Sequence, residues 1–402
     1  SEDGKFMRTG DPRINYAAMV LVRVVILKIC YTSLSMASTI ATRYSAVRRQ
    51  SELKPGEREP QILDYQTQQH KLFPCIAASY ALFFAKESLQ RAHDHIFHTE
   101  IPKGNFSGMA ELHVTSSGLK AFGAEMACEG IEICRRACGG HGYLLASGLP
   151  SLIMNASQLP TVEGENTVLY LQVARYLMKA CVNVNNLNNG KPIRGIAGYL
   201  RADPGPSKMS SQQDFLDITQ LLHAFQARAY RQVNEVVKSV QKEIQRGSEH
   251  YLVWNSHAVL LVEAAKAHCE VTLVQNFVDS LRQLSASSDI IRVLTTMCQL
   301  YAVHRIIAKY GDFLRFGVVN KEQLEVIQST EFHLLSVIRP DAVPLVDAHD
   351  WHDMSLNSAL GAFDGNVYQR LYESARKAPI NNREVHPAGL KDETSIHEKA
   401  KL

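Results

Sequence analysis

The chain has 402 residues, which is enough for two or three domains with substantial cores. Hydrophobic residues make up 46% and charged residues 21%, a composition typical of a soluble globular protein and of neither a disordered chain nor a membrane protein. Lysine and arginine number 43 against 40 aspartate and glutamate residues. The near-neutral balance lacks the basic excess of a nucleic-acid-binding protein, so we expect no nucleic-acid partner.

The first half of the chain predicts four long helices joined by short polar links. The apolar runs cover Tyr16 to Arg43, Tyr65 to Phe97, Gly108 to Cys138, and about Gly164 to Val184. This arrangement favours an antiparallel four-helix bundle. The most apolar stretch lies within the first run, from Met19 to Ile29, where Arg23 and Lys28 interrupt it. It is too short to cross a bilayer, so we interpret it as a buried helix and expect no membrane span.

A second helical unit follows a polar break. An Asn-rich segment at 185–192 ends the first unit, and a Pro-Gly segment at 203–207 marks a second interruption. Apolar residues then repeat at intervals of three and four from Phe215 to Ile244, with Ser211 before the run and Gly247 after it. With further apolar runs at 253–284 and 290–308, the chain is predicted to be all-α. We divide it into a bundle at 1–190, a linker at 191–209, a second helical domain at 210–380 and a tail at 381–402.

Eight cysteines are scattered through the apolar runs without the spacing of a disulfide framework. Reduced, buried thiols in an intracellular protein are therefore expected. Cys134 and Cys138 share one helix face, but the chain offers too few nearby ligands for a metal, and we predict no metal site.

Thr161-Val162-Glu163-Gly164-Glu165-Asn166 carries the candidate base, Glu163. A carboxylate among apolar neighbours can abstract a proton next to a carbonyl, since desolvation raises its pKa. Gly164 beside it lets a ligand approach the backbone. The alternative is a first-turn glutamate stabilised by the helix dipole. Glu165 is the rival base, although a helix-start role suits it better.

About twenty residues earlier, Gly139-Gly140-His141-Gly142 follows a helix that carries Arg136. Such a loop can present backbone amides to a phosphate, with Arg136 adding charge, although a glycine helix stop is the commoner meaning. Arg48 lies at the close of the first predicted helix, where the residues alone indicate a cationic last turn stabilised by the helix dipole. Arg23 stands alone in its apolar run, and a buried charge needs a partner or a ligand.

Three motifs together resemble one enzyme family. These are Glu163-Gly164-Glu165-Asn166-Thr167-Val168, Cys138-Gly139-Gly140-His141-Gly142-Tyr143, and Asp364-Gly365-Asn366-Val367-Tyr368 preceded by Leu360-Gly361. They resemble the acyl-CoA dehydrogenase and oxidase superfamily, and in particular its peroxisomal acyl-CoA oxidase branch. The third motif, read from the residues as an Asp-Gly turn before a helix, is typical of the C-terminal domain of the oxidases.

The resemblance implies a reaction and a cofactor. Glu163 would remove the α proton of a fatty acyl-CoA while the β hydride passes to FAD, giving a trans-2-enoyl-CoA, and molecular oxygen would reoxidise the flavin to give hydrogen peroxide. The resemblance further implies a homodimer, in which the glycine loop touches the ADP part of an FAD held mainly by the partner subunit. Where the family often has an aromatic residue after Arg-Arg-Gln, this chain has Ser51.

The same resemblance assigns further residues. Arg23 and Gly164 would lie near the substrate, and His141 is read as structural or interfacial. The residues expected to contact the cofactor are Arg48, Gln66, Arg136, Gly139, Gly140 and Glu165.

The C-terminal Ala400-Lys401-Leu402 is a close variant of the Ser-Lys-Leu address that a peroxisomal import receptor reads at a free C-terminus. Taken alone it could be a plain solvated tail, but beside the oxidase motifs it predicts the peroxisomal matrix. Family members carry a helical and a β domain upstream of the matching region, so we expect a C-terminal fragment or short isoform. Two alternatives stay open: a non-catalytic dimerisation partner of a longer subunit, and a dehydrogenase that passes electrons to a flavoprotein.

Overall fold

The computed structural model describes residue 4 and residues 12–185 and 195–382, with side chains from Ala18 to Val182 in the first long segment. Within this part of the chain the fold is all-α, as predicted, and the only β interaction is a bridge between Arg49 and Gln61. The tripeptide Ala400-Lys401-Leu402, most of the predicted tail and part of the predicted linker lie outside the described residues.

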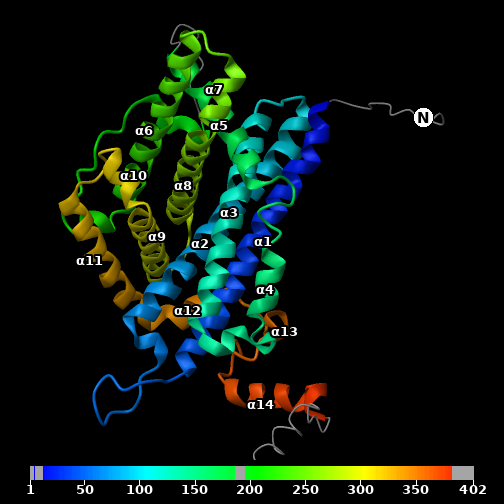
Figure 1. Ribbon diagram of the computed structural model, residues 1–402, viewed down its shortest axis with the longest axis vertical. Helices are drawn as coiled ribbons and strands as arrows, with labels where there is room; N and C mark the ends of the chain where they lie inside the picture. Colours follow the sequence, from blue (N-terminus) through cyan, green and yellow to red (C-terminus); the bar gives the residue numbers. More distant parts are fainter. Residues whose placement is uncertain (1–3, 5–11, 186–194, 383–402) are drawn as a thin grey trace, which may run out of the picture.

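The predicted four-helix bundle is present, with one short helix that the apolar pattern missed. Its long helices reverse direction one after another (Figure 1). They are α1 (Pro12–Val47), α2 (Gln66–His95), α3 (Met109–Ala137) and α5 (Asn166–Asn185), and the unpredicted short helix is α4 (Leu149–Ala156).

Small residues on α3 let α1 approach it closely. A Cβ added at Gly130 would lie 2.5 Å from Leu34 Cδ1, and one added at Gly123 would lie 2.9 Å from Leu27 Cδ1. Both leucines are fully buried. Close approach of α1 and α3 therefore depends on glycine at these two positions.

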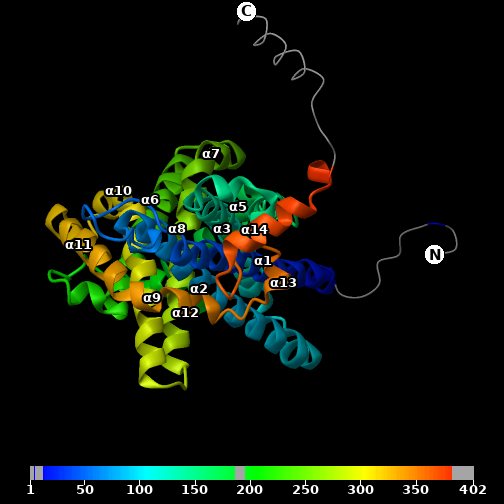
Figure 2. The same ribbon diagram turned by 90° about the horizontal axis from the view of Figure 1, so that it is seen from below.

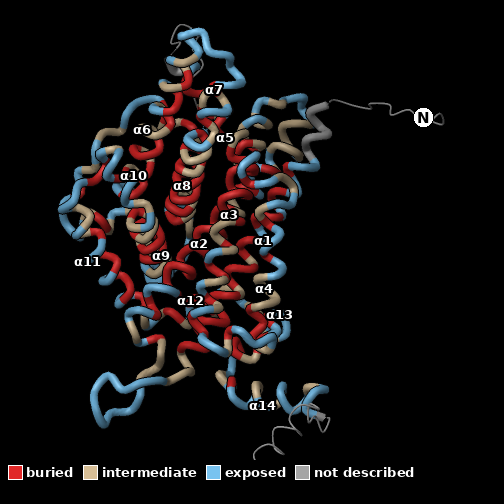
Figure 3. Tube along the Cα trace, in the orientation of Figure 1, coloured by how far each residue is buried: buried red, intermediate tan, exposed pale blue. Residues whose placement is uncertain are grey.

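The second half of the chain is helical as well. Its elements are α6 (Ile218–Gln245), α7 (His250–Ser256), α8 (Ala258–Gln283), α9 (Ser288–Ala308), α10 (Tyr310–Arg315), α11 (Lys321–Ile338), α12 (Ala342–Asp347), α13 (Asp353–Leu356) and α14 (Val367–Lys377). Helices α8 and α9 pack against α2, where the rings of Phe84 and Phe277 lie 4.9 Å apart. The buried core is continuous from the first bundle into this half (Figure 3). The domain boundaries given above stay a prediction.

The start of α6 differs from the predicted one. Ser211 was expected to precede the helix, but α6 begins at Ile218, where the Asp217 side chain accepts a hydrogen bond from Thr219 N at 2.8 Å. Ser211 caps an earlier turn instead, accepting from Asp214 N at 3.2 Å. Gly247 follows the end of α6 with φ +92°, as a helix-stop glycine should.

The argument that the apolar stretch of α1 is too short to cross a bilayer is wrong. Because the helix continues well beyond Met19 to Ile29, three described helical stretches are long and apolar enough to cross a bilayer: Ala18–Val47, Gln66–Lys103 and Ser288–Ala308. Much of each is covered by the rest of the fold, with 72% of the relevant window buried in the second stretch. All eight cysteines are free, and no group of side chains in the described ranges is arranged to hold a metal.

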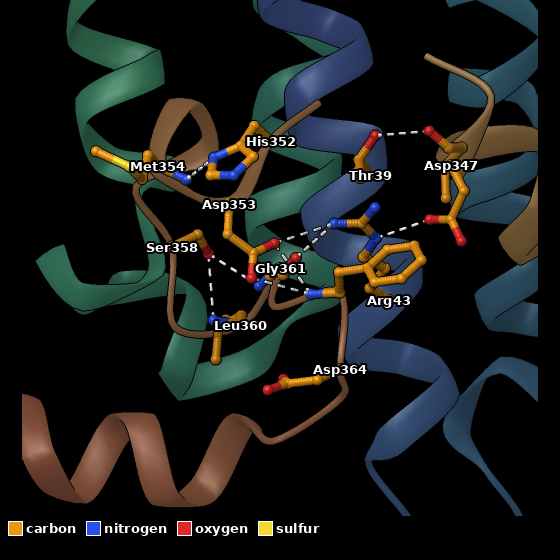
Figure 4. A network of polar contacts seen from close by, with 12 residues as sticks. Thr39, Arg43, Asp347, His352, Asp353, Met354, Ser358, Leu360, Gly361 and Asp364 are labelled. Atoms are coloured by element: carbon orange, nitrogen blue, oxygen red, sulfur yellow. Dashed lines mark hydrogen bonds and ion pairs between the residues drawn. The ribbon is translucent and has the colours of Figure 1, made fainter. Parts of the chain in front are cut away.

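Arg43 joins the segment 347–361 to α1 (Figure 4). This buried guanidinium donates to Asp347 Oδ1 and to the carbonyl of Gly361, both at 2.8 Å, and lies 3.6 Å from Asp353 Oδ1. Asp364 Oδ1 then accepts from Asn366 N at 2.9 Å, forming the predicted turn into α14. Figure 2 shows α14 lying across the end of the bundle.

Candidate functional site

Glu163 lies in a turn between α4 and α5, three residues before the first residue of α5, and is half-buried. Its backbone adopts φ +56°, which is rare for a residue with a side chain, and Gly164 follows at φ +117°. Left-handed backbone costs an ordinary residue about 1–2 kcal/mol. A residue held in this conformation is common at functional sites, where the surrounding structure stabilises the strain.

Two buried cations from different helices hold this turn. Arg23 on α1 is 2% exposed and donates from Nε to the Glu163 carbonyl at 3.3 Å. Lys120 on α3 is fully buried and donates from Nζ to the Gly164 carbonyl at 2.7 Å. Consecutive carbonyls of the turn thus accept charge-assisted hydrogen bonds from two neighbouring helices.

Arg23 and Lys120 have further partners that fix their positions. Arg23 Nη1 donates to Ser117 Oγ at 3.0 Å, and Lys120 Nζ donates to Asn166 Oδ1 at 3.2 Å. Asn166 in turn donates to the Ala121 carbonyl at 3.0 Å. Burial lowers the pKa of Lys120, and the nearby Arg23 lowers it further, while Glu165 and Glu163 act in the opposite direction.

The two candidate carboxylates have different surroundings. Glu165 is exposed and accepts from Val168 N at 3.2 Å and from Thr167 Oγ1 at 3.0 Å, so it caps the start of α5. Hydrogen bonds from Thr167 and Val168 lower its pKa. Within the described residues, the Glu163 carboxylate has no hydrogen-bond or ion-pair partner. Glu163 is therefore the carboxylate that is free to take a proton from a ligand.

An exposed apolar surface lies beside the turn. On α1, within two turns of Arg23, five large aliphatic side chains are exposed, and Val162 and Val168, near Glu163 in sequence, have 37% and 53% of their surface exposed. The α1 residues are Met19, Leu21, Val22, Val25 and Ile29. Such a surface suits an apolar ligand or a covering domain.

Five of the six predicted cofactor residues gather at the opposite end of α1, and the sixth, Glu165, lies beside Glu163 instead. Gln68 ties this end together, because its amide donates to Ser45 Oγ on α1 at 3.0 Å and to the Ala137 carbonyl of α3 at 2.8 Å. The ends of α1 and α3 and the start of α2 therefore meet. These ends carry Arg48, Gln66, Arg136, Gly139 and Gly140.

This end is open to solvent. Gly139, at φ +59°, and Gly140 are exposed, and a Cβ added to either would meet no atom within 4 Å. Arg136 is exposed, and Arg48 is partly so. The residues present fit a phosphate-bearing group, since accessible backbone amides stand beside guanidinium groups.

Glu163 and Arg48 do not belong to one pocket. From Arg23 to the end of α1 at Val47 the helix rises about 36 Å, at about 1.5 Å per residue. The structure therefore brings together Arg23, Glu163 and Gly164 in one place, and the residues around Arg48 in another.

Sequence reasoning missed several residues at both sites. Lys120 interrupts an apolar run as Arg23 does, so the same buried-charge argument could have found it.

The partner of His141 is Tyr44, whose hydroxyl lies 2.8 Å from His141 Nδ1. Arg48 donates to the hydroxyl of Tyr368 on α14 at 3.4 Å, and this hydrogen bond raises the pKa of Arg48. No local signal could have indicated that contact, because the two residues are far apart in sequence.

Comparison with known proteins gives concordant matches. Residues 16–178 match the family model described as "Acyl-CoA oxidase, C-alpha1 domain", and residues 217–391 match the model described as "Acyl-CoA oxidase". Mouse peroxisomal acyl-coenzyme A oxidase 2 is 42% identical over 388 residues, covering 95% of this chain and 57% of that protein. Human peroxisomal acyl-coenzyme A oxidase 1 is 41% identical over 391 residues, covering 96% and 58%.

Solved structures agree. The acyl-CoA oxidase of tomato has a TM-score of 0.89 at 36% identity, covering 96% of this chain and 58% of the other. The acyl-CoA oxidase-2 of Caenorhabditis elegans, bound with FAD, ascaroside-CoA and ATP, has a TM-score of 0.90 at 34% identity, covering 100% and 59%. The chain thus spans a little under three fifths of the length of the relatives it matches.

Proposed function

Because this chain belongs to the acyl-CoA oxidase family, we propose that it provides the catalytic base and part of the FAD site of a peroxisomal acyl-CoA oxidase. The overall reaction is fatty acyl-CoA plus molecular oxygen giving trans-2-enoyl-CoA and hydrogen peroxide. The observation that carries the proposal is the Glu163 carboxylate, which is free of protein partners among the described residues in a turn held by Arg23 and Lys120.

Glu163 is the proton acceptor of the proposed reaction. It takes the α proton of the acyl thioester. Gly164 lets the turn pack tightly against α5, because a Cβ added there would lie 2.7 Å from Leu169 Cδ2. Arg23 and Gly164, assigned to the substrate site, act here through the backbone of the turn. The apolar surface of α1 beside Glu163 suits an acyl chain.

The chain's own residues would hold the phosphate-bearing part of FAD at the other end of α1. Arg48 and Arg136 supply positive charge, and Gly139 and Gly140 supply accessible backbone, with Gln66 beside them. When bound, FAD supplies the redox chemistry, accepting the β hydride and returning the electron pair to oxygen. Glu165 is assigned to the same cofactor, although in this chain its carboxylate caps α5.

The separation of the two sites along α1 supports a homodimer. Arg23, which holds the Glu163 turn, lies roughly 36 Å from the end of α1. We therefore expect the two sets of residues of one chain to serve different FAD molecules. If two copies are arranged so that the Arg48 end of one lies near the Glu163 end of the other, both sets of residues can serve one FAD.

Oxygen consumption tests the activity. The FAD-loaded holoenzyme, meaning the complete oxidase that contains residues 1–402, should consume oxygen and release an equal amount of hydrogen peroxide when given a saturated fatty acyl-CoA and no added electron acceptor. Turnover only with an added electron-transferring flavoprotein would identify a dehydrogenase instead. Binding of FAD without turnover, restored by mixing with a longer oxidase subunit, would identify a dimerisation partner.

The proposed location is the peroxisomal matrix, supported by the peroxisomal names of the relatives and by Ala400-Lys401-Leu402. Deleting Leu402 should leave a fluorescently tagged protein in the cytosol, with the tag at the N-terminus and activity in lysate unchanged, because the receptor reads a free C-terminus. A Ser1→Ala variant with the intact C-terminus serves as the control. Import of the deleted protein in cells lacking any intact subunit would contradict the assignment.

A further inference from the structure

The turn that presents Glu163 depends on side chains for its stability. Among the described residues, no backbone N–H donates to the carbonyls of Glu163 or Gly164 outside the helices. The Glu163 carbonyl accepts a hydrogen bond from Arg23 Nε, and the Gly164 carbonyl accepts one from Lys120 Nζ. Since Glu163 also has an unfavourable φ of +56°, the conformation would relax if these donors were lost.

Lys120 is the closer of the two donors and the better placed to control the turn. Its ammonium reaches the Gly164 carbonyl at 2.7 Å and Asn166 Oδ1 at 3.2 Å. It therefore bridges the residue after the base and the first residue of α5. The ammonium is fully buried, and burying it is costly unless it is well hydrogen-bonded, so a purely apolar residue would serve packing better.

We propose that Lys120 is a positioning residue for the catalytic base: its buried ammonium fixes the Glu163-Gly164 turn against the start of α5 and adds positive charge beside the carboxylate. This inference rests on the proposed role of Glu163. It assigns Lys120 no contact with substrate or cofactor. The charged and titratable groups around the turn are Arg23 and Cys30 from α1, His113 and Lys120 from α3, and Glu165 before the start of α5.

Lys120→Met in the FAD-loaded holoenzyme tests the proposal, since methionine fills a similar volume but cannot donate. We expect kcat to fall about 10- to 100-fold with little change in KM, because a base displaced by about 1 Å loses that much. A role in packing alone would lower the melting temperature without this split between kcat and KM.

A second readout does not depend on turnover. Hydrogen exchange of the peptide covering residues 160–168 should accelerate in Lys120→Met, while peptides from α8 and α9 keep their protection. Lys266→Met is the matched control, because Lys266 is partly exposed on α8 and pairs with Glu125 at 3.1 Å. It should leave kcat, KM and the exchange of this peptide unchanged.

Three outcomes decide the matter. If Glu163→Gln is inactive but Lys120→Met matches the wild type in kcat and in the exchange of residues 160–168, the inference about Lys120 is overturned while the proposed base stands. If Glu163→Gln is itself active, the proposed function fails. Should Lys120→Met not fold, Lys120→Gln takes its place, because its shorter, uncharged amide cannot reproduce the bonds of the ammonium to both Gly164 and Asn166. A lower kcat and faster exchange of residues 160–168 are expected from it, and wild-type values of both would overturn the proposal.

Discussion

The two ends of α1 hold their functional groups in opposite ways. At the Glu163 end, buried side chains from α1 and α3 hold the backbone of a strained turn, and the carboxylate itself is left free. At the Arg48 end, the groups are exposed, and the Tyr368 contact of Arg48 is long, at 3.4 Å. A group that moves a proton requires a fixed position, whereas groups that bind a phosphate can be ordered by the ligand. The Glu163 end is thus preorganised, whereas we expect the groups at the Arg48 end to become ordered only when a ligand or another protein surface binds them.

Expressing residues 1–402 alone gives the largest expected effect. The chain should fold as a mainly helical dimer with a cooperative melt, yet purify colourless and release no peroxide with acyl-CoA. The reason is that the described residues expose phosphate-binding groups but contain no sheet to cradle a flavin ring. Absorbance near the flavin bands and a peroxide assay provide the measurement. A yellow, active preparation with stoichiometric FAD would show that the flavin site is self-contained.

Glu163→Gln in the holoenzyme should lower turnover by at least about three orders of magnitude, because the amide cannot take up the α proton. FAD content and melting temperature should stay close to wild type, since no described residue bonds to this carboxylate. Glu165→Gln is the matched control and should keep most of the activity. An inactive Glu165→Gln beside an active Glu163→Gln would reverse the assignment of the base.

Arg48→Ala should weaken FAD binding roughly 10- to 100-fold, the range for loss of a hydrogen bond to a charged group. Turnover at saturating FAD should change little, because Glu163 is remote from Arg48 within the chain. Titration of apoprotein with FAD measures the effect. Arg49→Ala, which removes a neighbouring guanidinium that donates to the Glu59 carbonyl at 2.8 Å, is the control. Equal FAD affinity in both variants would leave Arg48 as a helix-end cation.

Tyr44→Phe should have the smallest effect, a loss of about 1 kcal/mol in the free energy of unfolding, because one hydrogen bond to His141 disappears. Burial raises the pKa of Tyr44 from 10.0 to about 12. The folded state therefore holds this proton more tightly, and the associated stability is present below pH 10 and lost as pH rises toward 12. Denaturant melts should show less alkaline destabilisation in Tyr44→Phe than in the wild type. An identical pH dependence would mean that Tyr44 is already solvated.

Local patterns in the sequence determined the helical class, the position of the four long helices and the candidate base. Apolar periodicity and glycine helix stops depend only on residues that are neighbours along the chain, so both can be recognised from the sequence alone. The same patterns could also mislead. Asp217 rather than Ser211 caps the start of α6, and the true length of α1 overturned the argument drawn from Met19 to Ile29.

Only the tertiary structure decided how the functional residues are grouped. Arg23 and Lys120 stand out in the sequence as charges within apolar runs, but their shared target, the Glu163 turn, lies 140 residues from Arg23. The separation of Arg48 from Glu163 depends on the straight course of α1, and the Arg48–Tyr368 contact joins residues 320 apart. Such contacts are set by how helices pack, because burial and the matching of donors to acceptors act between segments that the local pattern cannot connect.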